Sequence, residues 1–440
     1  MLRECYQISI VVLFLNKAVT KVKSKALKYL ILCMLLWPLV TVAQLPSIFN
    51  SDFEKKQIHQ SSPDFGKAGI QLFLAATLGD DPTAMHNAEN EFGEIIHKLE
   101  QDYPVRSKET RQVDFIYRGL RKAMFKHYTY IAEVAETFES GTFNCVGSTA
   151  LVALALDHFG FSYEIQRLPN HVFLYAKADE KWLRIETTSL DIGVIREKRI
   201  STAERNAVGR RKRSKVTPET INLQDLAGWQ YYNEGLKAMD ASTHELAFKS
   251  FYKASLLNAN AEIEEMLDLA NASLLKAAKE ALAAEDYEYA INQLALANKV
   301  GRADNESVLC LAASILGKAE SISDISASLN FLKKMQADFP KAMALPAVQA
   351  AIADRHLALA LEGSTELDTA NEQLMEFIKT VNSSQCPFDL SLAESSFSSV
   401  IENHKALGQM DAARTLAKQF GKLKLHRIQL DQGTQIFAGK

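Results

Sequence analysis

The sequence has little glycine and proline, and neither sign of charge is in excess. There are 19 glycines and 10 prolines among 440 residues, and 50 basic side chains against 53 acidic ones give a formal net charge of −3. A chain this close to neutral gives no electrostatic reason to expect nucleic acid as a partner. The sequence also lacks CxxC and HExxH pairs and a glycine-rich phosphate loop, so we expect no zinc site and no cofactor.

One apolar run stands out, and it is short. Lysines precede the run at 29–40 and Ala43 follows it, which is the order of a secretory signal. The uncharged stretch 29–43 is shorter than the about 20 residues that a bilayer span needs, and Pro38 interrupts it. We therefore expect residues 1–43 to be the signal peptide of an exported, periplasmic protein. The alternative is an anchor in the inner membrane, formed by residues 29–43.

Cysteine is scarce as well, with five in the chain, at positions 5, 33, 145, 310 and 386. Cleavage near Ala43 would leave the last three, and an odd number in an exported protein leaves at least one thiol free. Cys310 and Cys386 could pair with each other or lie buried in helices. Cys145 is the cysteine whose neighbours in the sequence point to chemistry.

Residues 62–135 have the pattern of amphipathic helices, with a helix start at the Asp-Pro pair 81–82. A further helix is expected to begin at Cys145, because apolar residues recur every three or four positions after it and Asn144 is a good N-cap. Gly160 suits the C-terminal end of this helix. Cys145 would then lie in the first turn of a buried helix.

After this helix the period changes to two, which predicts strands near residues 163–167, 171–176 and 182–188. His171 opens the second of these strands, and Glu186 lies near the end of the third. The helix and the strands would pack as one layer on another, in an α+β domain.

The loop between the last two strands decides whether His171 and Glu186 can meet. On antiparallel neighbours the two side chains share a face when the loop has an even number of residues. A loop at 178–179 makes them direct neighbours. A loop at 179–180 offsets them along the same face and puts Phe173 opposite Glu186, whereas an odd loop without a bulge separates them.

Cys145, His171 and Glu186 are the residue types that a thiol enzyme needs. The nucleophile is a thiolate, and the unpaired N–H groups and positive dipole end of a helix start favour that anion. A neighbouring imidazole takes the proton, and a carboxylate holds the imidazole in the correct tautomer and orientation. Two other candidates are weaker, because His158 lies several turns along the Cys145 helix and Asp191 falls outside the strands.

This block resembles the core of the transglutaminase-like superfamily, whose fold is related to that of papain. The family has a Cys that opens a helix, a strand with His, and a last strand ending in Trp-x-x-x-Asp-x-Thr, which Trp182 to Thr188 match with Glu186 in place of Asp. The resemblance implies that Cys145 is the nucleophile, His171 the base and Glu186 the orienting acid. The chain is also similar to a bacterial subgroup in which such a core precedes tetratricopeptide (TPR) repeats.

Two consequences of the resemblance concern geometry. Glu186 is longer than the usual Asp by one methylene, so the imidazole of His171 could sit differently. An oxyanion also needs hydrogen-bond donors, and the backbone N–H of Cys145 is the expected first donor. Gln112 and Tyr130 are the upstream candidates for a second one.

From about residue 221 the chain has the pattern of helical repeats. Gly235, Ala247, Phe251 and Ala254 have the spacing of the small and packing positions of a TPR unit, and Tyr231 fits the aromatic of its first helix. Weaker copies follow at intervals of roughly 40 residues, longer than the roughly 34 of a standard unit. We expect a TPR-like solenoid with a concave surface for a protein partner, and an irregular helical bundle is the alternative.

The predicted fold is therefore an α+β transglutaminase-like domain, with the Cys helix packed on an antiparallel sheet, followed by an all-α TPR-like helical solenoid. We place the first domain with its N-terminal helices at 44–200, a basic linker at 201–220 and the repeats at 221–440. The linker contains a run of arginines and lysines, which we interpret as solvated rather than as a surface for anions.

The expected function is that of an exported cysteine-type hydrolase or acyltransferase acting on a peptide amide. Water as the acceptor would make it a peptidase or amidase, and an amine would make it a transglutaminase. The alternative is a non-catalytic peptide- or protein-binding scaffold with a degenerate core and TPR-like repeats. In both cases we expect a peptide or protein partner, no nucleic acid, and membrane contact only through an uncleaved N-terminal segment.

Overall fold

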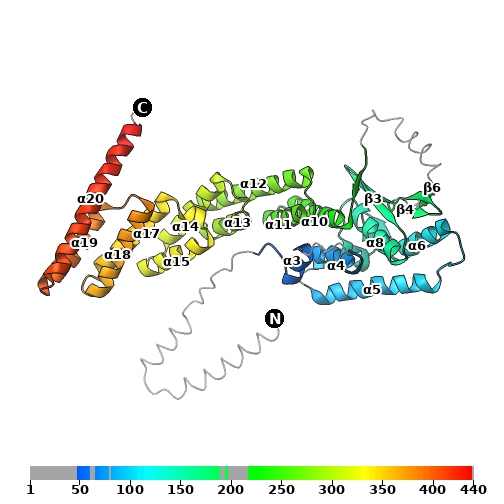
Figure 1. The fold of residues 1–440 in the computed structure, drawn as a ribbon, viewed down its shortest axis with the longest axis horizontal. Helices are drawn as coiled ribbons and strands as arrows, with labels where there is room; N and C mark the ends of the chain where they lie inside the picture. The colour runs from blue at the N-terminus through cyan, green and yellow to red at the C-terminus, as the bar shows by residue number, and fades with distance from the viewer. Residues whose placement is uncertain (1–46, 60–64, 79–80, 189–193, 197–216, 439–440) are drawn as a thin grey trace, which may run out of the picture. The chain divides into compact units, whose positions relative to one another are not determined.

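The computed structural model describes residues 47–59, 65–78, 81–188, 194–196 and 217–438. The expected signal peptide or anchor at 1–43 lies outside the described residues. Most of the described chain is helical, and one group of strands lies beside helix α8 (Figure 1). Within the described ranges no helix is both long and apolar enough to cross a bilayer.

The first part of the described chain is helical, as predicted, up to Met124. Helix α5 begins at the expected place, because the Asp81 carboxylate accepts the backbone N–H groups of Thr83 (3.0 Å) and Ala84 (2.9 Å). The helical prediction for 62–135 is wrong after Met124, where a two-residue strand follows that is too short to show any periodicity. The elements are α3 (Asp52–His59), α4 (Phe65–Leu78), α5 (Pro82–Gln101), α6 (Glu109–Met124), β1 (His127–Tyr128), α7 (Val134–Glu139) and β2 (Thr142–Phe143).

Helix α8 (Cys145–His158) lies at the centre of the hydrophobic core of this half. Its residues 146–156 are all buried, and it packs against α4, α6, β3 and β4. The contact with α4 is close, since a Cβ atom on Gly69 would come within 2.4 Å of Leu154 Cδ2. Gly160 follows the helix with a φ of +78°, a left-handed conformation that confirms the predicted helix end.

The main sheet has five strands in the order β6-β5-β4-β3-β7, and all its neighbours are antiparallel. The β4–β5 connection is the two-residue loop Asp179-Glu180, because Ala178 pairs with Lys181. Both loop residues have positive φ, of 50° and 57°, as a tight hairpin turn requires. The strands are β3 (Tyr163–Leu168), β4 (His171–Ala178), β5 (Lys181–Ile185), β6 (Val194–Arg196) and β7 (Glu219–Ile221).

Strand β7 corrects the predicted linker. The linker was placed at 201–220, but Glu219 and Thr220 pair with Arg167 and Gln166 of β3 and close that edge of the sheet. A three-residue edge strand has too few positions for an alternating pattern, so the sequence gives no local sign of it. The basic tract at 210–215 lies outside the described residues.

The C-terminal part consists of helices, each packed against its neighbours in sequence. The expected packing positions of the first repeat meet, since a Cβ on Gly235 would come within 2.6 Å of the Phe251 ring, and Ala247 and Ala254 are fully buried. The TPR-like assignment itself stays a prediction. The helices are α10 (Leu223–Asp240), α11 (His244–Leu257), α12 (Ala261–Ala283), α13 (Tyr287–Lys299), α14 (Asn305–Ser321), α15 (Ile325–Asp338), α16 (Pro340–Met343), α17 (Pro346–Glu362), α18 (Leu367–Ser384), α19 (Leu390–Ala406) and α20 (Met410–Ala438).

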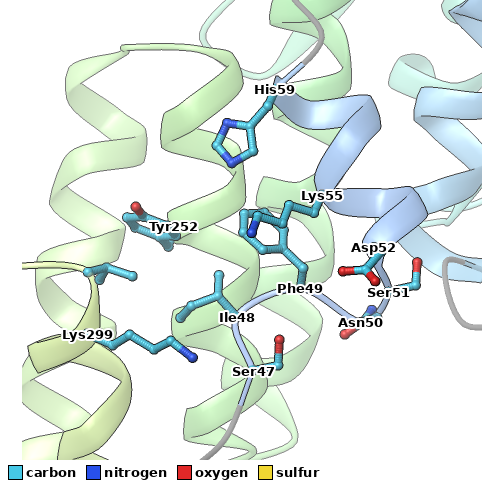
Figure 2. Close-up of a pocket in the computed structure, with 11 residues that line it drawn as sticks. Ser47, Ile48, Phe49, Asn50, Ser51, Asp52, Lys55, His59, Tyr252 and Lys299 are labelled. Carbon is cyan, nitrogen blue, oxygen red and sulfur yellow. The ribbon is translucent and has the colours of Figure 1, made fainter. Parts of the chain in front are cut away.

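The segment before α4 docks on these helices through a buried ion pair. Glu54 of α3 and Lys253 of α11 are both fully buried, with 2.8 Å between the carboxylate and the ammonium. The Tyr231 hydroxyl also donates to Glu54, at 3.1 Å. Figure 2 shows Ile48 and Lys55 of the docked segment beside Tyr252, around a cavity of about 480 Å³. The hydrophobic core thus runs from the N-terminal helices into the first helices of the repeat region.

Candidate active site

Cys145 lies at the first position of α8, partly exposed, and Asn144 holds that helix start in place. The Asn144 side chain accepts the N–H of Gly147 at 2.9 Å, so the predicted N-cap is confirmed. Its amide group also donates to the carbonyl of Ala132 at 3.0 Å, and the residue is 1% exposed. The cap is therefore anchored at both ends, and the position of Cys145 follows from it.

The first turn of α8 offers two further donors. The N–H groups at the start of a helix have no partner within the helix. Asn144 takes that of Gly147, and within the described part of the chain the N–H groups of Cys145 and Val146 have no hydrogen-bond acceptor. Together with the positive end of the helix dipole they could stabilise a negative charge beside the Cys145 sulfur.

His171 and Glu186 form an ion pair, with 2.8 Å between His171 Nε2 and Glu186 Oε1. Cys145 lines the same cleft as His171, and its proximity is one of the causes that raise the pKa of the imidazole. The Asp179-Glu180 loop is the predicted arrangement in which the two side chains share a face at an offset, and the observed ion pair agrees with it.

The electrostatics of the site favour a charged imidazole. Burial of the His171 ring opposes protonation, but the hydrogen bonds to Cys145 and Glu186 and the charges of both outweigh it and raise the pKa of His171 to about 9. The pKa of Glu186 is lowered: burial works against the carboxylate, and the hydrogen bond and charge of His171, with Arg184 and Thr188, overcome it. At neutral pH the site therefore holds an imidazolium and a carboxylate.

Contacts with neighbouring side chains hold Glu186 in one orientation, although its side chain is one methylene longer than that of Asp. The Thr188 hydroxyl donates to Oε1 at 3.0 Å, and the Arg184 guanidinium donates to Oε2 at 3.3 Å. Arg184 in turn lies over the Phe173 ring, 3.9 Å from its centre. The longer side chain still reaches His171 at normal hydrogen-bond distance, because these contacts hold it in one orientation.

A second set of contacts ties the end of β5 to α8. The buried Thr187 hydroxyl lies 2.8 Å from that of Ser148 and 3.3 Å from that of Thr149. The Tyr117 hydroxyl donates to the carbonyl of Glu186 at 3.2 Å. The sequence gives one sign of these supporting residues, the two hydroxyl side chains Ser148 and Thr149 inside an otherwise apolar helix.

A cleft of about 180 Å³ opens beside Cys145 and His171. One side is formed by the β3–β4 turn, with Pro169 and Asn170, and another by the face of α10 that carries Trp229. The cavity of Figure 2 shares no lining residue with this cleft. The α10 wall was not predicted, because the sequence analysis treated the chain after 221 as a separate domain.

The other residues considered from the sequence are the two possible oxyanion donors and the two weaker candidates for the site. Gln112 is not an oxyanion donor here, since its amide donates to the carbonyls of Pro104, Val105 and Ser107. Tyr130 lines the cleft. His158 pairs with Glu100 at 2.7 Å on the surface, and Asp191 lies outside the described residues.

Tyr128 is a neighbour of the site that the sequence did not indicate. Burial raises the pKa of its hydroxyl, and the charges of Cys145, Tyr130 and Glu186 raise it further. The phenol therefore lies within electrostatic reach of the thiol. Its position follows from β1, which pairs with β2 just before Cys145.

The other described cysteines, Cys310 and Cys386, are free and buried, and burial raises the pKa of both thiols. Across the described ranges no group of three or more His, Cys, Asp or Glu side chains is arranged to hold a metal ion. The sequence matches no protein-family model, and no curated protein or solved structure matches it either. The chemistry of the site therefore has to be argued from its own residues.

Proposed function

We propose that the protein is a thiol-dependent acyl-transfer enzyme that acts on peptide amides, with Cys145 as nucleophile, His171 as general acid and base, and Glu186 as the orienting carboxylate. The observation that carries the proposal is the 2.8 Å ion pair of His171 and Glu186 beside Cys145, which begins a buried helix and lines the same cleft as His171. These are the three residue types that thiol catalysis requires.

In the proposed reaction, the Cys145 thiolate attacks the amide carbonyl, and the N–H groups of Cys145 and Val146 receive the oxyanion. The His171 imidazolium gives its proton to the leaving amine, the C–N bond breaks, and a thioester remains on Cys145. His171, now neutral, takes a proton from water or from an acceptor amine, which attacks the thioester and regenerates the thiolate. Glu186 stabilises the imidazolium throughout.

The pH dependence of alkylation tests this proposal. An ordinary thiol has a pKa near 8.5 and is almost fully protonated at pH 6. If Cys145 and His171 form the thiolate–imidazolium pair that the proposal requires, Cys145 should react rapidly with iodoacetamide at pH 6. We expect His171→Ala to lower the rate at pH 6 by on the order of 100-fold, as measured by mass spectrometry of the Cys145 peptide.

The chain supplies its own controls. Cys310 and Cys386 are buried and should label only on unfolding, so they report the integrity of each preparation. His158→Ala removes a surface histidine from the same helix and should leave the Cys145 rate unchanged. If Cys145 fails to label at pH 6, or labels equally in His171→Ala, the acyl-transfer proposal is wrong and the non-catalytic peptide-binding scaffold becomes the working hypothesis.

A further inference from the structure

One face of helix α10 forms a wall of the cleft beside Cys145. Trp229, Tyr232, Asn233 and Leu236 all line the cleft, and their spacing of three and four residues places them on one side of the helix. A helix of the repeat region therefore completes the site of the α+β half. Whatever reaches the Cys145 sulfur through this cleft has to contact α10.

The wall is held rigidly. Helix α10 packs against α8 and α4, and it begins with a reciprocal cap between Asn222 and Asp225. Trp229 is 5% exposed and meets the Tyr232 ring edge to face at 4.9 Å. Lys237 ties the other end of the helix to α7 through Glu133 at 2.9 Å. The cleft is thus formed before a ligand arrives, which limits the entropy cost of binding.

Each charged group along this wall already has a partner, with two carboxylates around one guanidinium. The Arg167 guanidinium lies over the Trp229 ring, 3.7 Å from its centre, and bonds to Glu262. Glu262 also accepts from the Tyr232 hydroxyl at 3.2 Å, and Glu219 lies 3.7 Å from Arg167. A charged side chain entering the cleft would therefore find no unpaired partner on these groups, and its desolvation would not be repaid.

The cleft volume of about 180 Å³ is below the roughly 300–1,000 Å³ of sites that enclose a whole small molecule. It suits a single large side chain next to a polymer backbone. The carboxamides of Asn170 and Asn233 line the same space and could pair with the N–H and C=O groups of that backbone.

We infer that α10 is the specificity wall of the site, and that it selects peptides with an uncharged apolar or aromatic side chain on the residue whose carbonyl Cys145 attacks. The inference rests on the proposed thiol chemistry and adds the class of substrate to it. Aromatic and aliphatic surface on the half-buried Tyr232 and Leu236 contacts that side chain, and the buried Trp229 supports Tyr232 from behind.

The test uses peptidyl chloromethyl ketones Ac-Ala-Ala-X-CH₂Cl, with X as Leu, Phe, Asp or Lys, in which the thiolate displaces chloride. Each rate is divided by the iodoacetamide rate of the same protein, which removes differences in thiol reactivity. For the unaltered protein we expect the Leu and Phe probes to react about tenfold faster than the Asp and Lys probes. Equal normalised rates for the four probes, with Cys145 still reactive to iodoacetamide, would contradict the inference that α10 selects the side chain. The proposal of thiol chemistry at Cys145 would not be affected.

Two matched variants each introduce one negative charge, one on the cleft face of α10 and the other outside the cleft. Asn233→Asp adds a negative charge with almost no change in shape, and it should raise the Lys-to-Leu rate ratio about fivefold. Asn292→Asp makes the same change on α13, outside the cleft, and should leave the ratio unchanged. A shift of equal size in both variants, or in neither, contradicts the inference.

A binding measurement decides the inference even if the thiol proves unreactive. The peptides Ac-Ala-Ala-X-amide, carrying a fluorophore on the amide, are titrated into Cys145→Ala and followed by fluorescence anisotropy. Tighter binding of the Leu and Phe peptides than of the Asp and Lys peptides supports the wall. Equal binding of all four, or binding that Asn233→Asp does not alter, counts against it independently of catalysis.

Discussion

At the scale of single residues, the pKa of His171 is set by opposing effects. Burial alone would lower its pKa, yet the hydrogen bonds and charges of Cys145 and Glu186 raise it to about 9. A fully exposed histidine loses its charge near pH 6.5. The protonation state of the site at neutral pH thus depends on two neighbours rather than on solvent exposure.

Glu186→Gln separates these contributions. Removing an opposite charge in hydrogen-bond contact should lower the pKa of His171 by about 1–3 units. The folded-state pKa is raised, so the stabilisation from this group is present below the unfolded pKa and is lost as pH rises through about 9 in the unaltered protein. In Glu186→Gln that loss should occur at lower pH. Histidine ring signals in an NMR titration measure the change directly.

Glu100→Gln is the matched control for this titration. It removes a carboxylate that pairs with His158 at 2.7 Å, outside the cleft, so the His171 signal should titrate as it does in the unaltered protein. An unchanged His171 titration in Glu186→Gln would mean that the carboxylate does not hold the imidazolium.

At the scale of secondary-structure elements, the start of α8 matters most, because it sets where the sulfur lies. Asn144 binds both the helix start and the preceding chain, through Gly147 and Ala132. The Ser148 hydroxyl adds a bond to the Asn144 carbonyl at 2.6 Å. The helix start is therefore positioned from three sides.

Asn144→Ala should cost about 1 kcal/mol for the lost cap and about 1–3 kcal/mol more for the Ala132 carbonyl left without its donor. Chemical denaturation measures the change in the free energy of unfolding. The rate of Cys145 alkylation at pH 6 should fall as well. Asp304→Ala removes the corresponding cap of α14, so it should cost about 1 kcal/mol without any effect on that rate.

The elements around the site show what sequence can predict. The Asn144 cap, the Cys145 helix, the two strands of the hairpin and the possible loop positions all follow from signals within a few residues. Local patterns cannot show pairing between distant segments. Strand β7 joins β3 across more than 50 residues, and Trp229 enters the cleft from a helix that reads as part of another domain.

At the scale of the whole molecule, the core does not stop at the predicted domain boundary. A single hydrophobic cluster contains residues from α3, α8, the sheet and α10 to α12. The helices after β7 are therefore part of the fold that supports Cys145, rather than an appended module. The buried polar residues of α10 and α11 belong to the same region, and they make its stability depend on pH.

Glu234 is the residue that makes the stability of this region depend on pH. Burial raises its pKa to about 7, against the attraction of Lys253 and the hydrogen bond from Ser250. The folded state therefore binds a proton that the unfolded chain releases near pH 4.5, and stability falls as pH rises from about 4.5 to about 7. At about 1.4 kcal/mol per pKa unit, the loss is roughly 3 kcal/mol.

Glu234→Gln should remove this loss, because the carboxamide keeps an acceptor for the Ser250 hydroxyl without a charge. We expect the variant to be more stable than the unaltered protein at pH 8, by up to roughly 3 kcal/mol, and similar to it at pH 5. Denaturant titrations at both pH values measure the difference. Glu265→Gln changes an exposed glutamate of α12 and should show no such pH dependence, and a parallel response of the two variants would refute the assignment.

The buried pair of Glu54 and Lys253 has a consequence for the order of assembly during synthesis. Its two members are 199 residues apart in the sequence, and each is fully buried in the folded chain. At about 5–20 residues per second, a ribosome needs roughly 10–40 s to reach the lysine after it has made the glutamate. During that interval the carboxylate can only be solvated by water. Docking of α3 against Lys253 therefore cannot be completed until α11 has been made, at a stage when the helices after it are still to be synthesised.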